Sequence, residues 1–412
     1  MEQKIKYQYT YFIYPYVIEE KNYQAYLYNL LKKENCKLKI FEPKKDIGIT
    51  SYFLPEVKDK MFWTLDLKRE GIREYHKMDK KVKAAVLSQK PCNIFDYELK
   101  NAIQGKMENQ EGIFFSIEKI QMICFQTGVC FLALKTTINS SDCFSELLNF
   151  NYKFRDIYSK LSHTKEYDNI KIQAEQFKDM KEVSDLMREI VGPNTLAKQI
   201  NLDTNRFLTY SYVCLDQTYW NENTPKEEIT GLFQKYKMVQ PAEEQSNDGF
   251  KENNHDYEEK YIKYGFSSTS TVLLTTDMNI KNYTTLPFDY ENKYFYHYIF
   301  NVYKKIYLKK ISYEFNHKRN FYFVKDKFLD FSRKDWIIEV TNDDIGKILE
   351  QKFSGQQELE ETFFKLKNKY DILYKDYEIE KHEKHNEWIV LVVLSLLIIC
   401  IFVLVGFFRG NP

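Results

Sequence analysis

Glycine, proline and cysteine are scarce in this chain, and their scarcity excludes several classes of protein. Its 412 residues include only 13 Gly, 9 Pro and 7 Cys. With so few turn-forming residues, we expect long regular elements joined by few tight turns. No Gly-rich phosphate-binding loop, H-E-x-x-H or G-x-S-x-G motif occurs. The sequence signatures of nucleotide-binding, metalloprotease and hydrolase sites are therefore missing, and we predict a protein that is not an enzyme.

The cysteines form no recognisable framework. They are odd in number, and no C-x-x-C pair exists, so neither a zinc ribbon nor a thioredoxin motif is predicted. A signal peptide is also missing, because the opening run "MEQKIKYQYTYFIYPYVI" contains Pro15 and no small-residue cleavage site. We therefore expect the soluble part to stay in the cytosol with reduced thiols. No cofactor follows from the sequence.

The chain also lacks a large net charge of either sign. The chain has 60 basic and 59 acidic residues, which argues against nucleic acid as a partner of the whole surface. What it has in abundance is aromatic side chains, with 33 Tyr and 31 Phe, and 43% of its residues are hydrophobic. The chain can therefore form a proper core, and its length suits one large or two modest domains.

Local patterns predict an α+β (mixed α/β) cytosolic domain over residues 1–290. The run 6–18 has the β-branched and aromatic content of a strand, and 22–33 repeats apolar residues at helical spacing. Two strand-like runs flank Thr127-Gly128, which predicts a hairpin. The polar, acidic segment 240–260 predicts a mobile loop. A helical region is expected over 291–355, including "TNDDIGKILEQ", which Thr341 or Asn342 would cap.

The region 356–387 predicts a stalk helix with one apolar side. Its apolar residues recur at alternating spacings of four and three, as in a packed helical seam, at Leu359, Phe363, Leu366, Tyr370, Leu373 and Tyr377. No Gly or Pro separates this seam from "WIVLVVLSLLIICIFVLVGFF" at 388–408. That run is about 30 Å long as a helix, enough to cross a bilayer once. We expect one continuous helix, with 409–412 as an extracytoplasmic tail.

Flanking charge predicts the orientation of the span. Four lysines at 369, 375, 381 and 384 precede it, and only Arg409 follows it. By the positive-inside rule the N-terminus is cytoplasmic, which gives a single-pass protein of the cell membrane. With so short a tail, we expect the span to be inserted after synthesis ends.

Three residues of the span continue the line of the stalk seam. At about 100° per residue, Ser395 falls five turns after Tyr377, and Phe402 and Gly406 lie close to the same line. Small residues allow helices to approach, so this stripe predicts self-association in preference to a lone anchor. The span contains no ionisable residue, which excludes a charged ring but leaves a hydrophobic gate open.

Two further clusters are candidate sites. His382 and His385, with Glu378 one turn earlier, could hold a metal if several subunits brought their copies together, but alternating charge favours a solvated helix. Four lysines lie among tyrosines and could contact an anionic ligand, a nucleotide or inner-leaflet lipid: Lys304, Lys305, Lys309 and Lys310. An amphipathic helix with its lysines in solvent is the favoured alternative.

The order of these parts resembles the CorA-like cation transporters. The likeness is carried by "TNDDIGKILEQ" and by residues 359–408, which would match the stalk and first transmembrane helix of that family. It implies a ring of subunits in which Ser395, Phe402 and Gly406 face a central axis. The chain departs from the family in having one span, and "GFFRGNP" lacks the Gly-Met-Asn signature.

We therefore expect a homo-oligomer whose cytosolic domain senses a ligand or protein partner and acts on the bilayer. Its action would be ion passage or membrane permeabilisation, for example in stress or phage defence. The alternative is a C-terminally anchored scaffold or binding module without a pore. A membrane-tethered enzyme is the least supported alternative. The expected partners are the lipid bilayer, further copies of the chain and a cytosolic ligand or protein.

Overall fold

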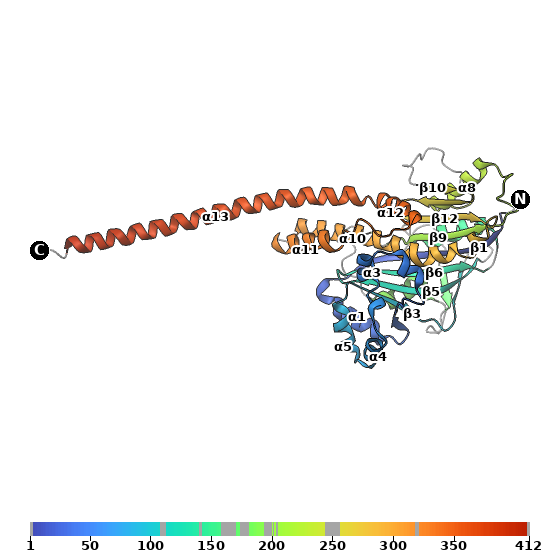
Figure 1. Ribbon diagram of the computed structural model, residues 1–412, viewed down its shortest axis with the longest axis horizontal. Coiled ribbons are helices and arrows are strands. Elements are labelled where there is room, and N and C mark those ends of the chain that lie inside the picture. The colour runs from blue at the N-terminus through green and yellow to red at the C-terminus, as the bar shows by residue number, and fades with distance from the viewer. Residues whose placement is uncertain are drawn as a thin grey trace.

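The computed structural model describes residues 3–107, 113–139, 142–157, 170–173, 181–192, 200, 202, 205–243, 256–317 and 321–409, with the backbone alone at 321–323, 402 and 405–409. Most of the predicted loop 240–260 lies outside these residues, because 244–255 are not described. The described chain forms a mixed α/β head from which one long C-terminal helix projects (Figure 1).

The head is built on one large sheet. Its strands follow the order β10-β11-β12-β9-β1-β6-β5-β4-β7-β8, and β3, with β2 beside it, also pairs with β5. All described pairs are antiparallel except β9 with β12. The strands are β1 Ile5–Val17, β2 Cys36–Leu38, β3 Cys92–Tyr97, β4 Ile103–Met107, β5 Phe114–Phe125, β6 Val129–Ile138, β7 Ile170–Gln173, β8 Lys181–Glu182, β9 Leu208–Leu215, β10 Tyr257–Glu259, β11 Ile262–Phe266 and β12 Ser270–Thr276.

The predicted N-terminal strand and hairpin are confirmed. Strand β1 lies between β6 and β9, but β9 pairs with it only as far as Ile13, so Pro15 removes no donor from that ladder. The β5–β6 hairpin turns at Gly128, whose φ is +83°. A Cβ at that position would lie 2.1 Å from the Ile18 carbonyl oxygen, so the turn requires glycine.

Helices cover both faces of the sheet. Alternation along β1 sends Tyr9, Tyr11 and Ile13 into one core and Phe12 and Tyr16 into the other. The first core is covered by α2 Ile47–Tyr52, α3 Pro55–Met61, α10 Phe295–His317, α11 Phe321–Lys334, α12 Asp344–Gln356 and the foot of α13 Leu359–Arg409. The second is covered by α1 Tyr23–Lys32, α5 Lys80–Ser88, α6 Phe144–Phe154, α7 Val183–Val191 and α8 Lys226–Met238, while α4 Arg69–Lys77 precedes α5.

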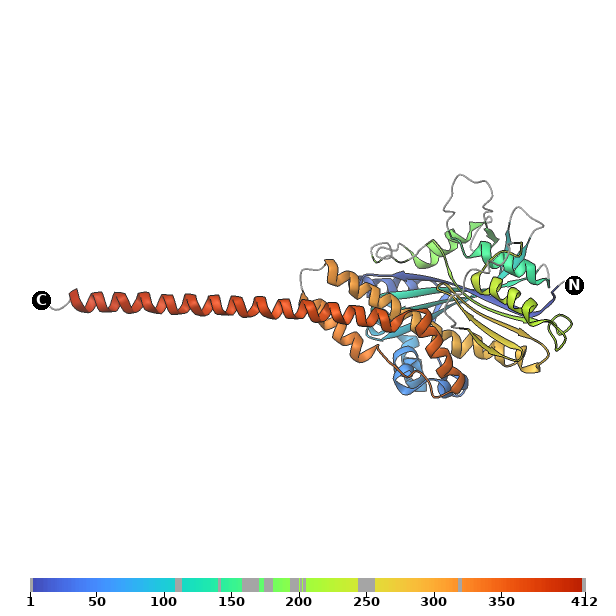
Figure 2. The same cartoon turned by 90° about the horizontal axis from the view of Figure 1, so that it is seen from above.

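Helix α10 is buried on nearly all sides. It follows the short helix α9 Leu286–Asp289 and a π-helical turn, Tyr290–Tyr294, and it lies between the sheet and an outer layer made of α11, α12 and the foot of α13. Figures 1 and 2 show this layering. An amphipathic helix with one solvent face was the favoured expectation for this segment. The structure differs because two of the lysines, Lys304 and Lys310, are buried: Lys304 faces Glu350 of α12, and Lys310 faces Glu20 and the tip of the β5–β6 hairpin.

Helix α12 begins one or two residues later than the predicted caps. Its N-cap is Asp343, whose Oδ1 accepts a hydrogen bond from the Gly346 N–H at 2.8 Å. Thr341 instead donates its hydroxyl to the Tyr52 carbonyl oxygen and forms a β-bridge with Phe53. The carboxylate of Asp343 is the better cap because it accepts at a helix N-terminus and carries negative charge there.

Helix α13 is continuous from Leu359 to Arg409, as predicted. Its 51 residues correspond to a rod about 75 Å long. Among the described residues, one helix, within Leu359–Ile401, is long and apolar enough to cross a membrane. The head meets this rod at Glu358, a non-glycine residue with a φ of +49° between α12 and α13. Figure 2 shows the rod projecting from one end of the head.

Candidate functional site

The foot of the rod is packed on its own head. Leu359 and Leu366 are buried, and Phe363, Tyr370 and Leu373 pack partly buried against the same core. The Phe363 ring stacks on Trp336, with centroids 4.2 Å apart. The seam that the heptad pattern predicted therefore exists, but down to Leu373 it contacts α10, α11 and the segment after α11. This is a correction, because a second copy of the chain was the expected partner of these residues.

Tyr374 still contacts the head, through the ammonium group of Lys325 at 4.9 Å from its ring centroid, while the side of the rod opposite the seam is exposed. Ile372 and Ile379 are 61% and 57% exposed and lie about 200° around the helix from the seam, on its opposite side. Ser395 is exposed, and its hydroxyl donates to the Val392 carbonyl oxygen of the same helix at 2.7 Å. Phe402 and Gly406, the other two residues of the predicted membrane stripe, are described by their backbone alone.

The predicted histidine site is not assembled within one chain. His382 and His385 are both exposed on α13. In the described part of the chain, no three His, Cys, Asp or Glu side chains are grouped so that they could hold a metal.

Three of the four candidate lysines of α10, Lys304, Lys305 and Lys310, have partners inside the chain. Lys304 and Lys310 are buried, at 2% and 4% exposure. Lys310 contacts Glu20 at 2.7 Å and also donates to the Thr127 carbonyl oxygen at the hairpin tip. Lys305 contacts Glu358 at 3.3 Å, and Lys309 is half-buried. The prediction that Lys304 and Lys310 contact an external anion or lipid is therefore corrected, because carboxylates or carbonyls of the head already neutralise or bind them.

Lys304 belongs to a buried network centred on Glu350 of α12. Its ammonium donates to the Ile337 carbonyl oxygen at 2.9 Å and lies 3.4 Å from Glu350 Oε1. The other carboxylate oxygen, Oε2, accepts from Asn301 Nδ2 at 2.8 Å and contacts His297 Nε2. His297, Asn301 and Lys304 lie on one side of α10, so this single carboxylate fixes α12 on α10.

A hydroxyl, an imidazole and a carboxylate lie in series in this network, from Tyr52 through His297 to Glu350. Tyr52 OH lies 2.7 Å from His297 Nδ1, and a carboxylate can only accept at Nε2, so Nε2 carries a hydrogen. The same order activates nucleophiles in catalytic triads. Here Tyr52 is 4% exposed and His297 is fully buried, so a substrate cannot reach the hydroxyl in this structure. The arrangement serves as a buried junction between α2, α10 and α12.

Electrostatics makes this junction sensitive to acid. Burial alone would raise the pKa of Glu350, but the charge of Lys304, the contact with His297 and the hydrogen bonds outweigh burial and lower the pKa to about 2. Burial lowers the pKa of Lys304, and Glu350 opposes that effect. The carboxylate is therefore ionised at neutral pH, and α12 is held on α10 by a charge-assisted contact.

A groove of about 500 Å³ opens beside the Glu350 network. Its walls come from the extended segment 336–341, from α12 and from the foot of α13. Lys304 and Glu350 border it on one side, and Trp336, Phe363 and Phe364 supply aromatic surface. Phe364 is 56% exposed, and Ile338 in the extended segment is 75% exposed. A concave, mainly apolar surface with a few charged groups is the usual form of a binding site. We name it the foot groove.

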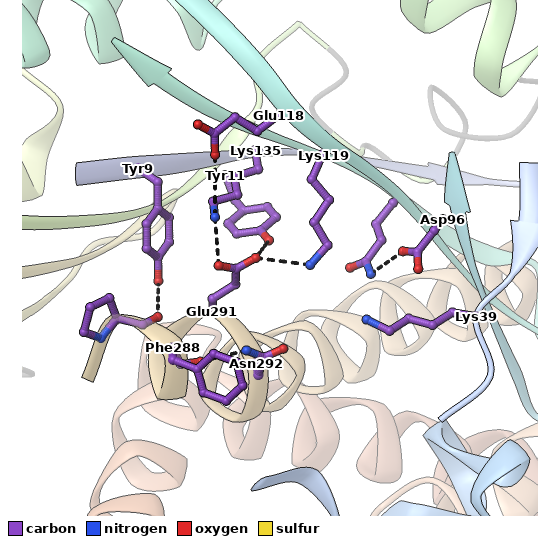
Figure 3. A network of polar contacts seen from close by, with 12 residues as sticks. Tyr9, Tyr11, Lys39, Asp96, Glu118, Lys119, Lys135, Phe288, Glu291 and Asn292 are labelled. Atoms are coloured by element: carbon purple, nitrogen blue, oxygen red, sulfur yellow. Dashed lines mark hydrogen bonds and ion pairs between the residues drawn. The ribbon is translucent and has the colours of Figure 1, made fainter. Parts of the chain in front are cut away.

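A second carboxylate network ties the π-helical turn to the sheet (Figure 3). Glu291 accepts from the Tyr11 hydroxyl at 2.8 Å and contacts Lys135 at 2.8 Å and Lys119 at 3.1 Å. Burial would raise the pKa of Glu291, but the two lysines lower it to about 2. The turn is anchored next to it by Tyr9, whose hydroxyl donates to the Pro287 carbonyl oxygen at 2.8 Å. These contacts position the start of α10, and hence the residues that reach Glu350.

Comparisons with known proteins give no relative. No family model matches the chain, and neither the curated proteins nor the solved structures contain a significant match. The residues described above are therefore the whole basis for a functional proposal.

Proposed function

We propose that the chain is a single-pass membrane protein whose cytosolic head binds a ligand or protein partner in the foot groove and passes that event to the membrane helix. The observation that carries this proposal is that head and rod share one groove: 336–341 supplies one wall, and Leu359, Phe363 and Phe364 of the rod supply another. Anything bound there contacts the rod directly.

The docking of the rod supports a sensor in preference to a loose tether. Residues 359–373 pack on α10 and α11 through the seam, so the head and the foot of the rod move together. From Tyr374 to Glu387 the helix is about 20 Å long, which would set the distance between the head and the bilayer. A ligand that shifts this docked foot would therefore change the orientation of the span.

The anchor and the orientation are tested first. Full-length protein should sediment with membranes and resist alkaline extraction, whereas a chain ending at Glu387 should be released. The head should be digested by protease only after the cell membrane is opened. A head that is digested in intact cells would place it outside, and a full-length chain released by alkali would remove the membrane protein altogether.

Coupling is tested by hydrogen exchange of the amides of 359–373 in detergent. Phe363→Ala should raise exchange across this segment because it removes the ring stacked on Trp336. Phe364→Ala is the matched control, since its ring is more than half exposed. Equal exchange in both variants and in the unaltered chain would show that the rod is not held at its foot, and the sensor proposal would fail.

A second candidate is self-association through the side of the lower rod that lies opposite the seam. Exposed Ile372 and Ile379 favour it, because two aliphatic side chains seven residues apart on a water-exposed helix face lack a partner in the described part of the head. In a Cys400→Ser background, Ile379→Cys should crosslink between copies and Lys381→Cys, on another side, should not. Ion flux in liposomes would then separate a pore from an anchored scaffold.

A further inference from the structure

A second cavity, of about 530 Å³, lies at the edge of the sheet away from the rod's foot. Its walls are the α1–β2 connection, strand β2 and the ends of α4 and α5. Lysine dominates it, with Lys33, Lys37, Lys39, Lys80 and Lys83 on its walls beside His76. We name it the lysine groove.

The lysine groove is more basic than the chain as a whole. Its walls carry five lysines against three acidic residues: Glu98 and Lys37 pair with each other at 2.5 Å, and Asp96 accepts from Gln121 Nε2 at 2.7 Å. Lys33 donates to the Glu189 and Ile190 carbonyl oxygens and Lys83 to the His76 carbonyl oxygen, so these partners carry no charge that would neutralise them. Residues 68–90, which include α4 and α5, hold eight Lys and Arg against three Asp and Glu, although the whole chain has a net charge of only +1. The surrounding surface therefore attracts anions.

Strand β2 presents a free backbone edge to this groove. It pairs with β3 alone, and Lys39 N–H donates to the Ile94 carbonyl oxygen at 2.7 Å while Glu98 N–H donates to Asn35 at 2.7 Å. Antiparallel ladders alternate, so these two bonds turn the N–H and C=O of Leu38 away from β3, toward the open side. Within the described chain no element pairs with that side of β2.

We propose that the lysine groove binds an acidic, extended segment of a partner protein, which adds to β2 as a further strand. Backbone hydrogen bonds to Leu38 would fix the register of the added strand. Carboxylates of the segment would form ion pairs with the lysines on both sides of the β2 edge. The lysines disfavour a neutral strand, because its addition would bury the charges of Lys33 and Lys83, which donate to carbonyl oxygens that carry no opposite charge. Nucleic acid offers the charge but cannot pair with a strand edge, so the peptide fits both observations.

The proposal is independent of the foot groove and is tested with the full chain in nanodiscs of neutral phosphatidylcholine. The probe is a fluorescein-labelled eight-residue peptide of alternating Glu and Val, followed by anisotropy at low and high salt. The same peptide with Lys in place of Glu, and a single-stranded DNA of equal charge, serve as competitors. The acidic peptide should bind and weaken as salt rises, and neither competitor should displace it at equal concentration.

Two matched pairs of variants locate the site. Lys80→Glu should weaken binding about five- to tenfold, because one attraction becomes a repulsion, whereas Lys81→Glu, next in the chain but not on the groove wall, should change it less than twofold. Leu38→Pro removes only the outward N–H and should weaken binding more than Leu38→Ala, which loses the same side chain but keeps the donor. Thermal melting identifies any variant that fails to fold.

Four outcomes would overturn the proposal. They are the absence of binding by the acidic peptide, displacement of the peptide by DNA at equal concentration, equal losses in Lys80→Glu and Lys81→Glu, and equal binding by folded Leu38→Pro and Leu38→Ala. If Leu38→Pro does not fold, the comparison of Lys80→Glu with Lys81→Glu tests the proposal by itself.

Discussion

Glu350→Gln tests the idea that one carboxylate holds α12, and with it the foot of the rod, on α10. The change is isosteric, and the amide oxygen can still accept from Asn301 and His297. What it removes is the negative charge 3.4 Å from Lys304, a side chain that is 2% exposed. Breaking one partner of a buried ion pair costs about 3–5 kcal/mol, because the other charge stays buried without compensation. We expect a loss of that size in the free energy of unfolding.

The assay is guanidinium unfolding of the full chain in detergent micelles, followed by tryptophan fluorescence. The decisive comparison is Glu350→Gln combined with Lys304→Met. The double variant no longer buries an uncompensated ammonium group, so it should recover about 2 kcal/mol or more of the loss. A double variant no more stable than Glu350→Gln, or a single variant within about 0.5 kcal/mol of the unaltered chain, would refute the reasoning.

The same carboxylate predicts an acid dependence with a definite sign. Its pKa in the folded chain is about 2, below the ordinary value of 4.5, so it stabilises the fold fully above pH 4.5. That stability is lost as the pH falls from 4.5 toward 2, and a pKa difference of this size corresponds to about 3 kcal/mol. Glu350→Gln should therefore flatten the dependence of unfolding free energy on pH across this window.

Three further changes are expected to act in different directions. Glu291→Gln should flatten the same acid window, because the folded pKa of Glu291 is also about 2, and urea unfolding at pH 3 and pH 6 checks this. Gly128→Ala should destabilise the fold by about 2 kcal/mol or more, since its φ of +83° and the Ile18 carbonyl oxygen both oppose a Cβ; the midpoint of urea unfolding measures this. Glu358→Gly should stabilise the fold by about 0.5–1 kcal/mol, because glycine adopts a φ of +49° without strain and the exposed contact with Lys305 contributes little; the melting temperature should rise.

The sequence predicted elements whose signals are local. β-Branched and aromatic content predicted β1, and two strand-like runs around Thr127-Gly128 predicted the β5–β6 hairpin. The absence of Gly and Pro between the seam and the apolar run predicted a single rod through Trp388. The heptad seam was also real, but periodicity only says that one side of a helix is covered. Periodicity does not identify the residues that cover it. The covering residues, Phe328 and Trp336, lie on α11 and in the segment after it, and their own spacing does not say which helix they cover.

The contacts of the candidate site could not be predicted from local sequence patterns, for a related reason. Lys304 and Lys310 look solvated in the sequence, because their carboxylate partners, Glu350 and Glu20, are 46 and 290 residues away. Burial of α10 on its outer side depends on the whole outer layer. One signal was available: His297, Asn301 and Lys304 recur on one side of an otherwise aromatic helix, and polar groups on a helix without a clear polar face call for buried partners.

If the head passes a binding event to the membrane helix, as proposed, the geometry of the rod makes its foot the place where the change must occur. From Leu359 to Trp388 the helix is about 44 Å long, so a 10° tilt about its foot would move the membrane entry by about 8 Å. If residues 359–373 stay docked, only the last 22 Å can bend, and the same angle gives about 4 Å. A large displacement therefore requires the foot itself to move relative to α10. The contacts that resist this are the ring stack of Phe363 on Trp336 and the Glu350 junction, and both border the foot groove. A ligand that separates 336–341 from the rod would act on both at once.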